Sequence, residues 1–235
     1  MVTKTKSEIQ IQDELVVEVP GVEISEEANE KIQQITQQYK AFLLERTNAF
    51  VQRSRMRVQT EATHPLLPSE YQYWNCLSVG PYQLTGSPSY LPSNIVEGGE
   101  LCLMIGAIWI NPADGPGASL PGTIVLGDRD YRFRFESINL TDVANGPDFT
   151  HVGTFPSPAN EVTVIPWVFS PADPGINPRL YEVNLTVDIL QTGQPLATFG
   201  SWHRDPSTEP AFLGEPTMGP HDQFERPARF LVYRK

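Results

Sequence analysis

Histidine carries the most versatile chemistry in this chain, because an imidazole can bind a metal or transfer a proton near neutral pH. The four histidines are His64, His151, His203 and His221, and no two of them are spaced as ligands on one helical turn. A zinc or iron site would therefore have to be assembled from distant segments, as His151, His203 and His221 with Asp205. Isolated histidines at strand ends are commonly solvated or bonded to the backbone, and we expect no cofactor.

Aromatic side chains give the second chemical candidate, because amphipathic rings on an exposed sheet face can stack on sugars. The surface candidates for such a ligand are Tyr71, Tyr73, Tyr82 and Tyr90. The four tryptophans each lie inside an apolar run, where filling the core is the simpler role. A carbohydrate-binding or other ligand-binding module is therefore one alternative function, and a metal-dependent enzyme with a His/Asp site is the second.

The patterns of established catalytic sites are absent from the sequence. The glycine–serine pairs at 86–87 and 200–201 do not complete the Gly-x-Ser-x-Gly pattern of a nucleophile elbow. The glycines between 115 and 122 are interleaved with proline and lack the lysine of a phosphate-binding loop. We therefore expect a protein that is not an enzyme.

One long helix is predicted near the N-terminus, before the segments that hold these candidate residues. The stretch from Ser25 to about Thr60 contains neither Gly nor Pro, although the chain holds 22 Pro and 17 Gly. Ser25 is a favourable N-cap, and Glu26 and Glu27 place negative charge in the first turn, where the helix dipole favours it. The sequence predicts an amphipathic helix over 25–62, about 50 Å long at 1.5 Å per residue.

An apolar stripe runs along this predicted helix. Its spacing begins as a coiled-coil seam, but a period of 3.6 residues gathers more side chains into a wider stripe. The stripe and an apolar plug in a later loop are the predicted oligomer or partner contacts: Ile32, Ile35, Tyr39, Phe42, Leu43, Phe50, Phe212 and Leu213. Two interpretations remain open, since the stripe can cover the chain's own body or bind another subunit. Deleting residues 1–62 is expected to leave a folded but smaller assembly.

Residues 63–235 read as a β body, because turn signals recur between runs of β-branched and aromatic residues. Strands are predicted at Tyr71–Val79, Leu101–Asn111, Tyr131–Leu140, Glu161–Phe169, Leu180–Leu190, Leu196–His203 and Arg229–Tyr233. The expected fold is mainly β: an antiparallel two-sheet β-sandwich, immunoglobulin-like or jelly-roll, preceded by one long N-terminal α-helix and without a second helix. A long Pro-rich loop is expected at 205–227.

Residues 1–24 form the predicted N-terminal arm, which is partly extended. Within it, Ile9, Ile11, Leu15 and Val17 alternate with mostly polar residues. This alternation is typical of an edge strand, or of an arm that adds to a neighbour's sheet.

Charge and cysteine usage narrow the list of partners. The formal net charge is -11 with a pI near 4.8, which excludes nucleic acid as an expected partner. No signal peptide or membrane-spanning run is seen, so we expect cytoplasmic residence and no membrane insertion. Cys76 and Cys102 lie in apolar runs that could face one another across a sandwich, and two buried thiols are expected rather than a disulfide. The favoured function is a self-associating structural or scaffold protein that binds itself or another protein.

Overall fold

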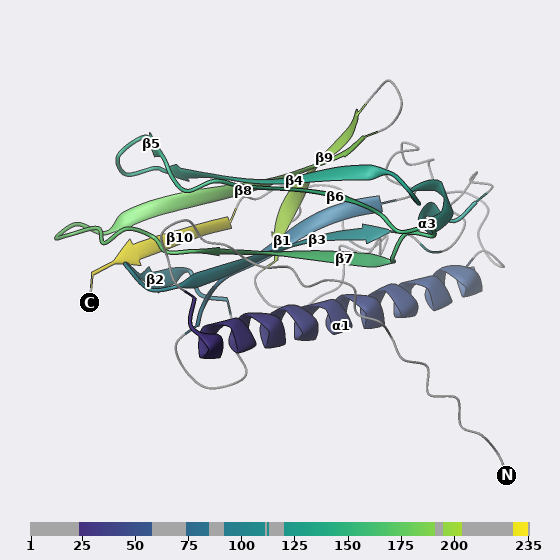
Figure 1. Cartoon of the computed structure of the whole chain (residues 1–235), viewed down its shortest axis with the longest axis horizontal. Helices are drawn as coiled ribbons and strands as arrows, with labels where there is room; N and C mark the ends of the chain where they lie inside the picture. The colour runs from purple at the N-terminus through teal and green to yellow at the C-terminus, as the bar shows by residue number, and fades with distance from the viewer. Residues whose placement is uncertain are drawn as a thin grey trace, which may run out of the picture.

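The computed structural model describes residues 24–57, 74–84, 92–110, 112, 120–190, 195–203 and 228–234, with backbone alone at 46, 47, 49–57, 75 and 195–203. The chain is mainly β, with one long helix before the strands (Figure 1). The elements are α1 Glu26–Arg57, β1 Trp74–Gln83, β2 Ile95–Glu97, β3 Cys102–Ile110, α3 Gly122–Val125, β4 Asp130–Asn139, β5 Ala144–Asn145, β6 Phe149–Thr154, β7 Val162–Phe169, β8 Arg179–Leu190, β9 Pro195–His203 and β10 Ala228–Tyr233.

The strands form two sheets that share β9. In the helix-side sheet, β3 pairs antiparallel with β1 and with β7. In the far sheet, β8 pairs antiparallel with β4, β9 and β10, β4 also pairs with β5 and β6, and β10 pairs with β2. Strand β9 pairs with β8 through residues 195–200 and with β1 through residues 201–203. It therefore runs from the far sheet into the helix-side sheet.

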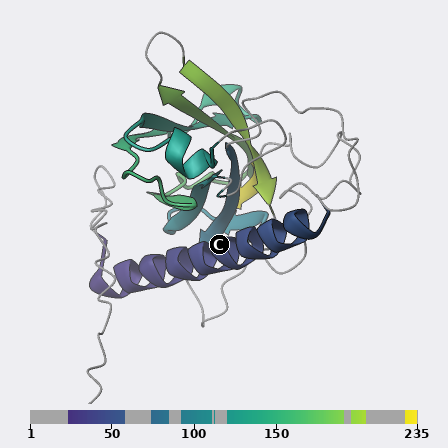
Figure 2. The same cartoon turned by 90° about the vertical axis from the view of Figure 1, so that its right-hand side faces the viewer.

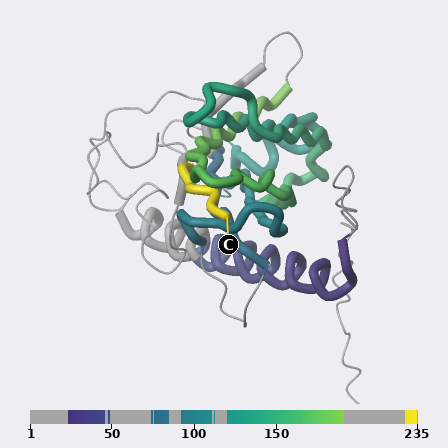
Figure 3. Tube along the Cα trace, turned by 90° about the vertical axis from the view of Figure 1, so that its left-hand side faces the viewer, coloured from purple at the N-terminus to yellow at the C-terminus, as the bar shows by residue number. Residues whose placement is uncertain are grey.

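Three layers result, with α1 lying across the outer face of the helix-side sheet (Figure 2, Figure 3). The core between the two sheets is aromatic, and Phe133 and Phe135 of β4 are fully buried in it. A second core lies between the helix-side sheet and α1. All nine residues of β3 are buried, because one face of this strand meets the far sheet and the other face meets the helix. This double burial explains why β3 is a continuous apolar run without alternation.

The helix begins where its local signals place it. The backbone N–H of Ala28 donates to Ser25 Oγ at 3.2 Å, which is the hydrogen bond of an N-cap side chain. Glu26 and Glu27 lie in the first turn, and Lys31 pairs with Glu27 at 2.8 Å one turn later. No helix in the described ranges is long and apolar enough to cross a membrane.

The strand inventory differs from the expected one in three ways. The short strands β2, β5 and β6 were not predicted, and the one-turn helix α3 contradicts the expectation of a single helix. Two pairings, β1 with β9 and β10 with β2, are parallel instead of antiparallel. These features depend on which distant segments meet, and short strands leave little periodicity in the sequence.

The two cysteines do not face one another across the sheets. Both are buried thiols that are not in a disulfide, and both belong to the helix-side sheet. Cys76 is paired with Ile108, which lies six residues along β3 from Cys102, so the two are about 20 Å apart at 3.4 Å per residue. A disulfide requires Cα atoms within about 7 Å. The facing arrangement that the sequence left possible is therefore not formed, because neighbouring antiparallel strands hold the two cysteines at opposite ends of their ladder, and the expectation of two buried thiols is confirmed.

These buried thiols make the stability of the fold fall at alkaline pH. Burial raises the pKa of Cys102 to about 12, helped by the charge of Glu100, and burial raises that of Cys76 as well. Above the ordinary thiol pKa of 9.0, the unfolded chain releases protons that the folded chain keeps, so the free energy of unfolding decreases. We expect a loss of about 1.4 kcal/mol per thiol by pH 10. Urea unfolding at pH 8, 9 and 10 measures it, and C102A should have the shallower pH slope; equal slopes would contradict the assignment.

Candidate functional site

The outer face of the far sheet is the surface on which a site can be built. Strand β4 turns Tyr131, Phe133 and Phe135 into the core and its intervening residues outward. Strand β8 alternates in the same way, so its outward side chains lie beside those of β4. The helix packs on the opposite sheet, and within the described part of the chain no helix packs on this face. This surface, here called the far face, is therefore defined by the outward residues of β4, β6, β8 and β10.

One end of the far face is charged. Arg132 is opposite Asp188 in the strand register, and its Nε and Nη2 both donate to Asp188 Oδ2, at 2.9 and 2.5 Å. Arg134 Nη2 lies 3.6 Å from the same oxygen. Asp188 is 6% exposed, so its desolvation is offset by two guanidinium groups. Two cations share this buried carboxylate, and Asp130 and Glu136 flank the arginines on the same face of β4.

The other end of the far face is apolar. Leu140 donates its N–H to the carbonyl of Leu180 at 2.8 Å, and Leu180 is opposite Leu231, which is in turn opposite Ile95. The four side chains form a row, here called the apolar row, across β8, β10, β2 and the end of β4. Ile95 is 54% exposed, Leu140 38% and Leu180 36%, and Leu231 is half-buried. Ile138, two residues before Leu140, extends the row on the same face.

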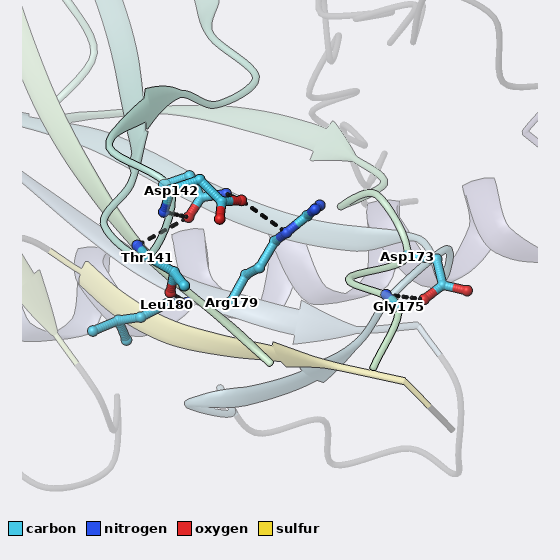
Figure 4. A network of polar contacts seen from close by, with 7 residues as sticks. Thr141, Asp142, Asp173, Gly175, Arg179 and Leu180 are labelled. Atoms are coloured by element: carbon cyan, nitrogen blue, oxygen red, sulfur yellow. Dashed lines mark hydrogen bonds and ion pairs between the residues drawn. The ribbon is translucent and has the colours of Figure 1, made fainter. Parts of the chain in front are cut away.

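Polar contacts fix the turn that carries Leu140 (Figure 4). The Asn139 side chain accepts from the N–H groups of Thr141 and Asp142, and Thr141 Oγ1 accepts from the N–H of Leu180 at 2.8 Å. Arg179 Nε pairs with Asp142 at 2.9 Å. The turn ends at Val143, which is 87% exposed at a φ of 52°. A β-branched residue in the left-handed region is strained, so this turn is held by its contacts and not by local preference.

The predicted contact residues of the helix are covered by the chain itself. Ile32, Ile35, Tyr39 and Leu43 are at most 3% exposed in the core against β1, β3 and β7. These four side chains therefore pack on the chain's own sheet and do not form the predicted coiled-coil or partner contacts. Their spacing suits a helix that lies on a sheet. Phe42 is half-buried and stacks on Tyr39 with ring centres 6.1 Å apart. The Phe50 side chain and residues Phe212 and Leu213 lie outside the described residues.

The predicted tyrosine platform is not formed as expected. Tyr82 lies on β1 with 2% of its surface exposed, in the core beneath α1, so it is corrected from a surface residue to a core residue. Its strand is covered on that face by the helix. Tyr71, Tyr73 and Tyr90 lie outside the described residues.

The predicted metal ligands are not brought together where the structure describes them. His151 lies on β6 with its ring tilted against that of Tyr131, ring centres 6.0 Å apart, whereas the backbone of His203 lies at the end of β9 in the helix-side sheet. Strands β4 and β8 separate β6 from β9, a distance of about 14 Å at 4.8 Å per strand. Two ligands of one zinc ion cannot lie so far apart. Asp205 and His221 lie outside the described residues, and among those described no three metal-ligating side chains cluster.

The apolar row is the feature that the sequence did not reveal. The sequence did carry a signal for two of its four residues, Leu140 and Leu180. Apolar side chains stand at the first outward position of β8, Leu180, and at the last outward positions along β4, Ile138 and Leu140, where polar residues are expected. Ile95 and Leu231 carry no such signal. They join the row only because β10 lies between β8 and β2.

Comparison with known proteins leaves the family of this chain open. No protein family model matches the sequence, and no curated protein matches it. Among solved structures, the chain shows a likeness to the CARDB domain of the PF1109 protein from Pyrococcus furiosus, which is in complex with di-metal ions. The identity is 13%, the TM-score is 0.28, and the match covers 61% of this chain and 100% of that chain. A likeness this loose carries no conclusion about function, and the mainly β architecture rests on the strands themselves.

Proposed function

We propose that this chain is a non-enzymatic, self-associating structural or scaffold protein, and that the apolar row of its far face mediates the subunit contact. The apolar row carries the proposal: four aliphatic side chains from β4, β8, β10 and β2 lie side by side with three of them at least one-third exposed. A contiguous apolar patch with a polar rim is typical of a protein interface.

Charge beside the apolar row supports a contact between identical copies. Arg229 and Glu182 lie next to the row and pair at 2.7 Å, with 62% of the arginine side chain exposed. In a two-fold interface the same surface meets itself, so each row would cover the other. Arg229 of one copy can then pair with Glu182 of the other copy, and the reverse. These two ion pairs would fix the relative orientation of the copies.

The proposal also includes the type of β-sandwich and the cellular compartment of the protein. An apolar core between two sheets supports an immunoglobulin-like or jelly-roll sandwich. Two buried cysteines that are not in a disulfide accord with a reducing compartment, so we place the protein in the cytoplasm, with a second copy of itself as the first partner.

Replacing one leucine of the row tests this function. L180K should weaken self-association by about 10- to 100-fold, because a charge in an apolar contact costs about 1.4 to 2.8 kcal/mol. L190K is the matched control, since Leu190 ends the same strand and is 41% exposed against 36% for Leu180. Light scattering coupled to size-exclusion chromatography measures the mass at several concentrations. A wild-type monomer at tens of micromolar, or an equal effect of the two substitutions, would refute the proposal.

A further inference from the structure

The free edges of the sheets differ in how they are protected. Among the described strands, β2, β5, β6 and β7 each have one pairing partner and therefore one open edge. Unpaired N–H and C=O groups on such an edge accept a further strand unless proline, charge or shortness prevents it. β2 has three residues and β5 has two, so the longer strands β6 and β7 are the edges to compare.

Strand β7 is blocked by a proline. The N–H of Ile110 donates to the carbonyl of Glu161 at 2.7 Å, which starts the β3–β7 ladder. By the alternation of an antiparallel ladder, Val164, Pro166 and Val168 direct their backbone groups to the open edge. Pro166 has no N–H to offer there, which is the usual position of proline in an edge strand.

Strand β6 has no such protection. The N–H of Phe155 donates to the carbonyl of Arg129 at 2.9 Å, and the same alternation turns the backbone groups of Thr150, Val152 and Thr154 to the open edge. The sequence of β6, FTHVGT, contains neither proline nor a charged residue. An extended segment can therefore bond to this edge with three successive outward residues.

The two faces beside this edge specify the chemistry of an added strand. On the inner face Phe149 is half-buried against the core, with its ring 6.4 Å from Trp167, so the core rim is incompletely covered. On the outer face Val152 is 61% exposed and lies beside Arg132, while Arg134 lies beside Thr150. An occupant with apolar side chains on one face and carboxylates on the other would match both.

We propose that β6 binds residues Ile9–Val19 of a second copy of this chain as an added strand. This segment alternates over most of its length. Ile9, Ile11, Leu15, Val17 and Val19 fall on one face together with Asp13, and Glu14 and Glu18 fall on the other face with Gln10, Gln12 and Val16. The apolar face would extend the core rim, and the carboxylates would lie two strand spacings, about 9.6 Å, from the backbone of β4, within reach of its arginines. The inference rests on the proposed self-association and adds a second contact to it.

A second copy is a better source of this strand than the same chain. Ile24 packs against the core beneath α1, whereas β6 belongs to the far sheet on the other side of the body (Figure 2). The seven residues from Val17 to Ile24 span at most about 25 Å, even fully extended. Two layers, each about 10 Å thick, would use most of that length before any lateral displacement. A neighbouring copy has no such limit.

Cross-linking of two variants that each carry one added cysteine tests the contact. V16C and V152C are mixed and treated with a short bismaleimide, while the native cysteines stay buried. Val16 and Val152 face the same side in the proposed pairing, so a covalent dimer of twice 26.3 kDa is expected. V16C mixed with V143C is the control, because Val143 is 87% exposed but distant from the β6 edge. The register of β4 with β5 places Val143 opposite Leu140, which is eight residues, or about 27 Å, from Arg132, the partner of Val152.

The outcomes separate this contact from the far-face contact. Absence of the mixed dimer overturns the inference, and a cross-link confined to the double variant V16C/V152C within one chain assigns the strand to the chain's own arm and also overturns it. A mixed dimer that persists in L180K supports the inference even if the apolar row does not mediate self-association.

A proline in β6 gives a second test. V152P, which copies the block at Pro166, should reduce the cross-link between V16C and an edge cysteine, T150C, at least 10-fold, and V152A is its control. If circular dichroism shows that V152P does not fold, a peptide of residues 8–19 replaces it as the test. An excess of this peptide should abolish the cross-link between V16C and T150C in chains that keep Val152. A cross-link that persists in the presence of the peptide would contradict the proposal.

Discussion

A chain that lacks residues 1–62 should fail to fold as a soluble body, contrary to the expectation from the sequence that it leaves a folded but smaller assembly. Removing α1 uncovers the outer face of the helix-side sheet, including Leu103 and Ile105, which are fully buried in the whole chain. The four buried side chains of the helix each contribute about 1.5 to 3 kcal/mol by burial, or about 6 to 12 kcal/mol together. A domain of this kind has only about 5 to 15 kcal/mol of stability in total.

Expression of the shortened chain, with light scattering and thermal unfolding of its soluble fraction, measures this effect. We expect aggregation or the absence of a cooperative transition. L43A gives a milder test in the full chain, with a loss of about 2 to 5 kcal/mol from a fully buried leucine, and Q38A, at an exposed position five residues earlier on the helix, is its control. A shortened chain that melts cooperatively near the wild-type temperature would show that the helix is dispensable for the body.

The second large effect is expected at Gly106, where β3 passes under the aromatic core. A Cβ at this position would lie 2.7 Å from Phe133 Cε1 and 2.9 Å from Phe135 Cζ, and both rings are completely buried. G106A should lose about 1 to 3 kcal/mol and G106V more, because neither ring has space to move away. Urea denaturation of the full chain measures both losses.

A compensating substitution makes the prediction at Gly106 specific. F133L removes the nearest ring atoms, so G106A should cost less in the F133L background than in the wild type, with a coupling of about 1 kcal/mol or more. A144V is the control for adding β-branched bulk to a strand, since Ala144 is exposed on β5. Additive losses for G106A and F133L would mean that the glycine is required for another reason.

Much of the local structure was predictable from short-range patterns. The absence of Gly and Pro after Ser25, with an N-cap and two acidic residues, predicts a helix start that lies within one residue of the observed one. Alternation at Tyr131, Phe133 and Phe135 predicts both a strand and its inward face, because the side-chain period of a strand is two. These signals act over a few residues, so they do not depend on the rest of the fold.

The candidate site was less predictable, because its parts come from four segments. Polar outward residues of β4 and β8 follow from alternation, but the meeting of Leu140, Leu180, Leu231 and Ile95 follows from the pairing of β8 with β10 and of β10 with β2. The last of these pairings is parallel and involves a strand of three residues. The same limit applies to β6, whose exposed edge exists only because β4 has its other partner in β8.

By itself, the sequence determined the long helix, the β character of the body, the acidic charge and the apolar stripe of the helix. The tertiary structure alone decided what that stripe covers, where β9 changes from one sheet to the other, and which strand keeps an open edge. The physical reason is one of range. Capping and periodicity depend on residues within one or two turns or strand lengths. Strand order and burial depend on free-energy differences between alternative contacts of distant segments, and a one-dimensional pattern does not rank those contacts.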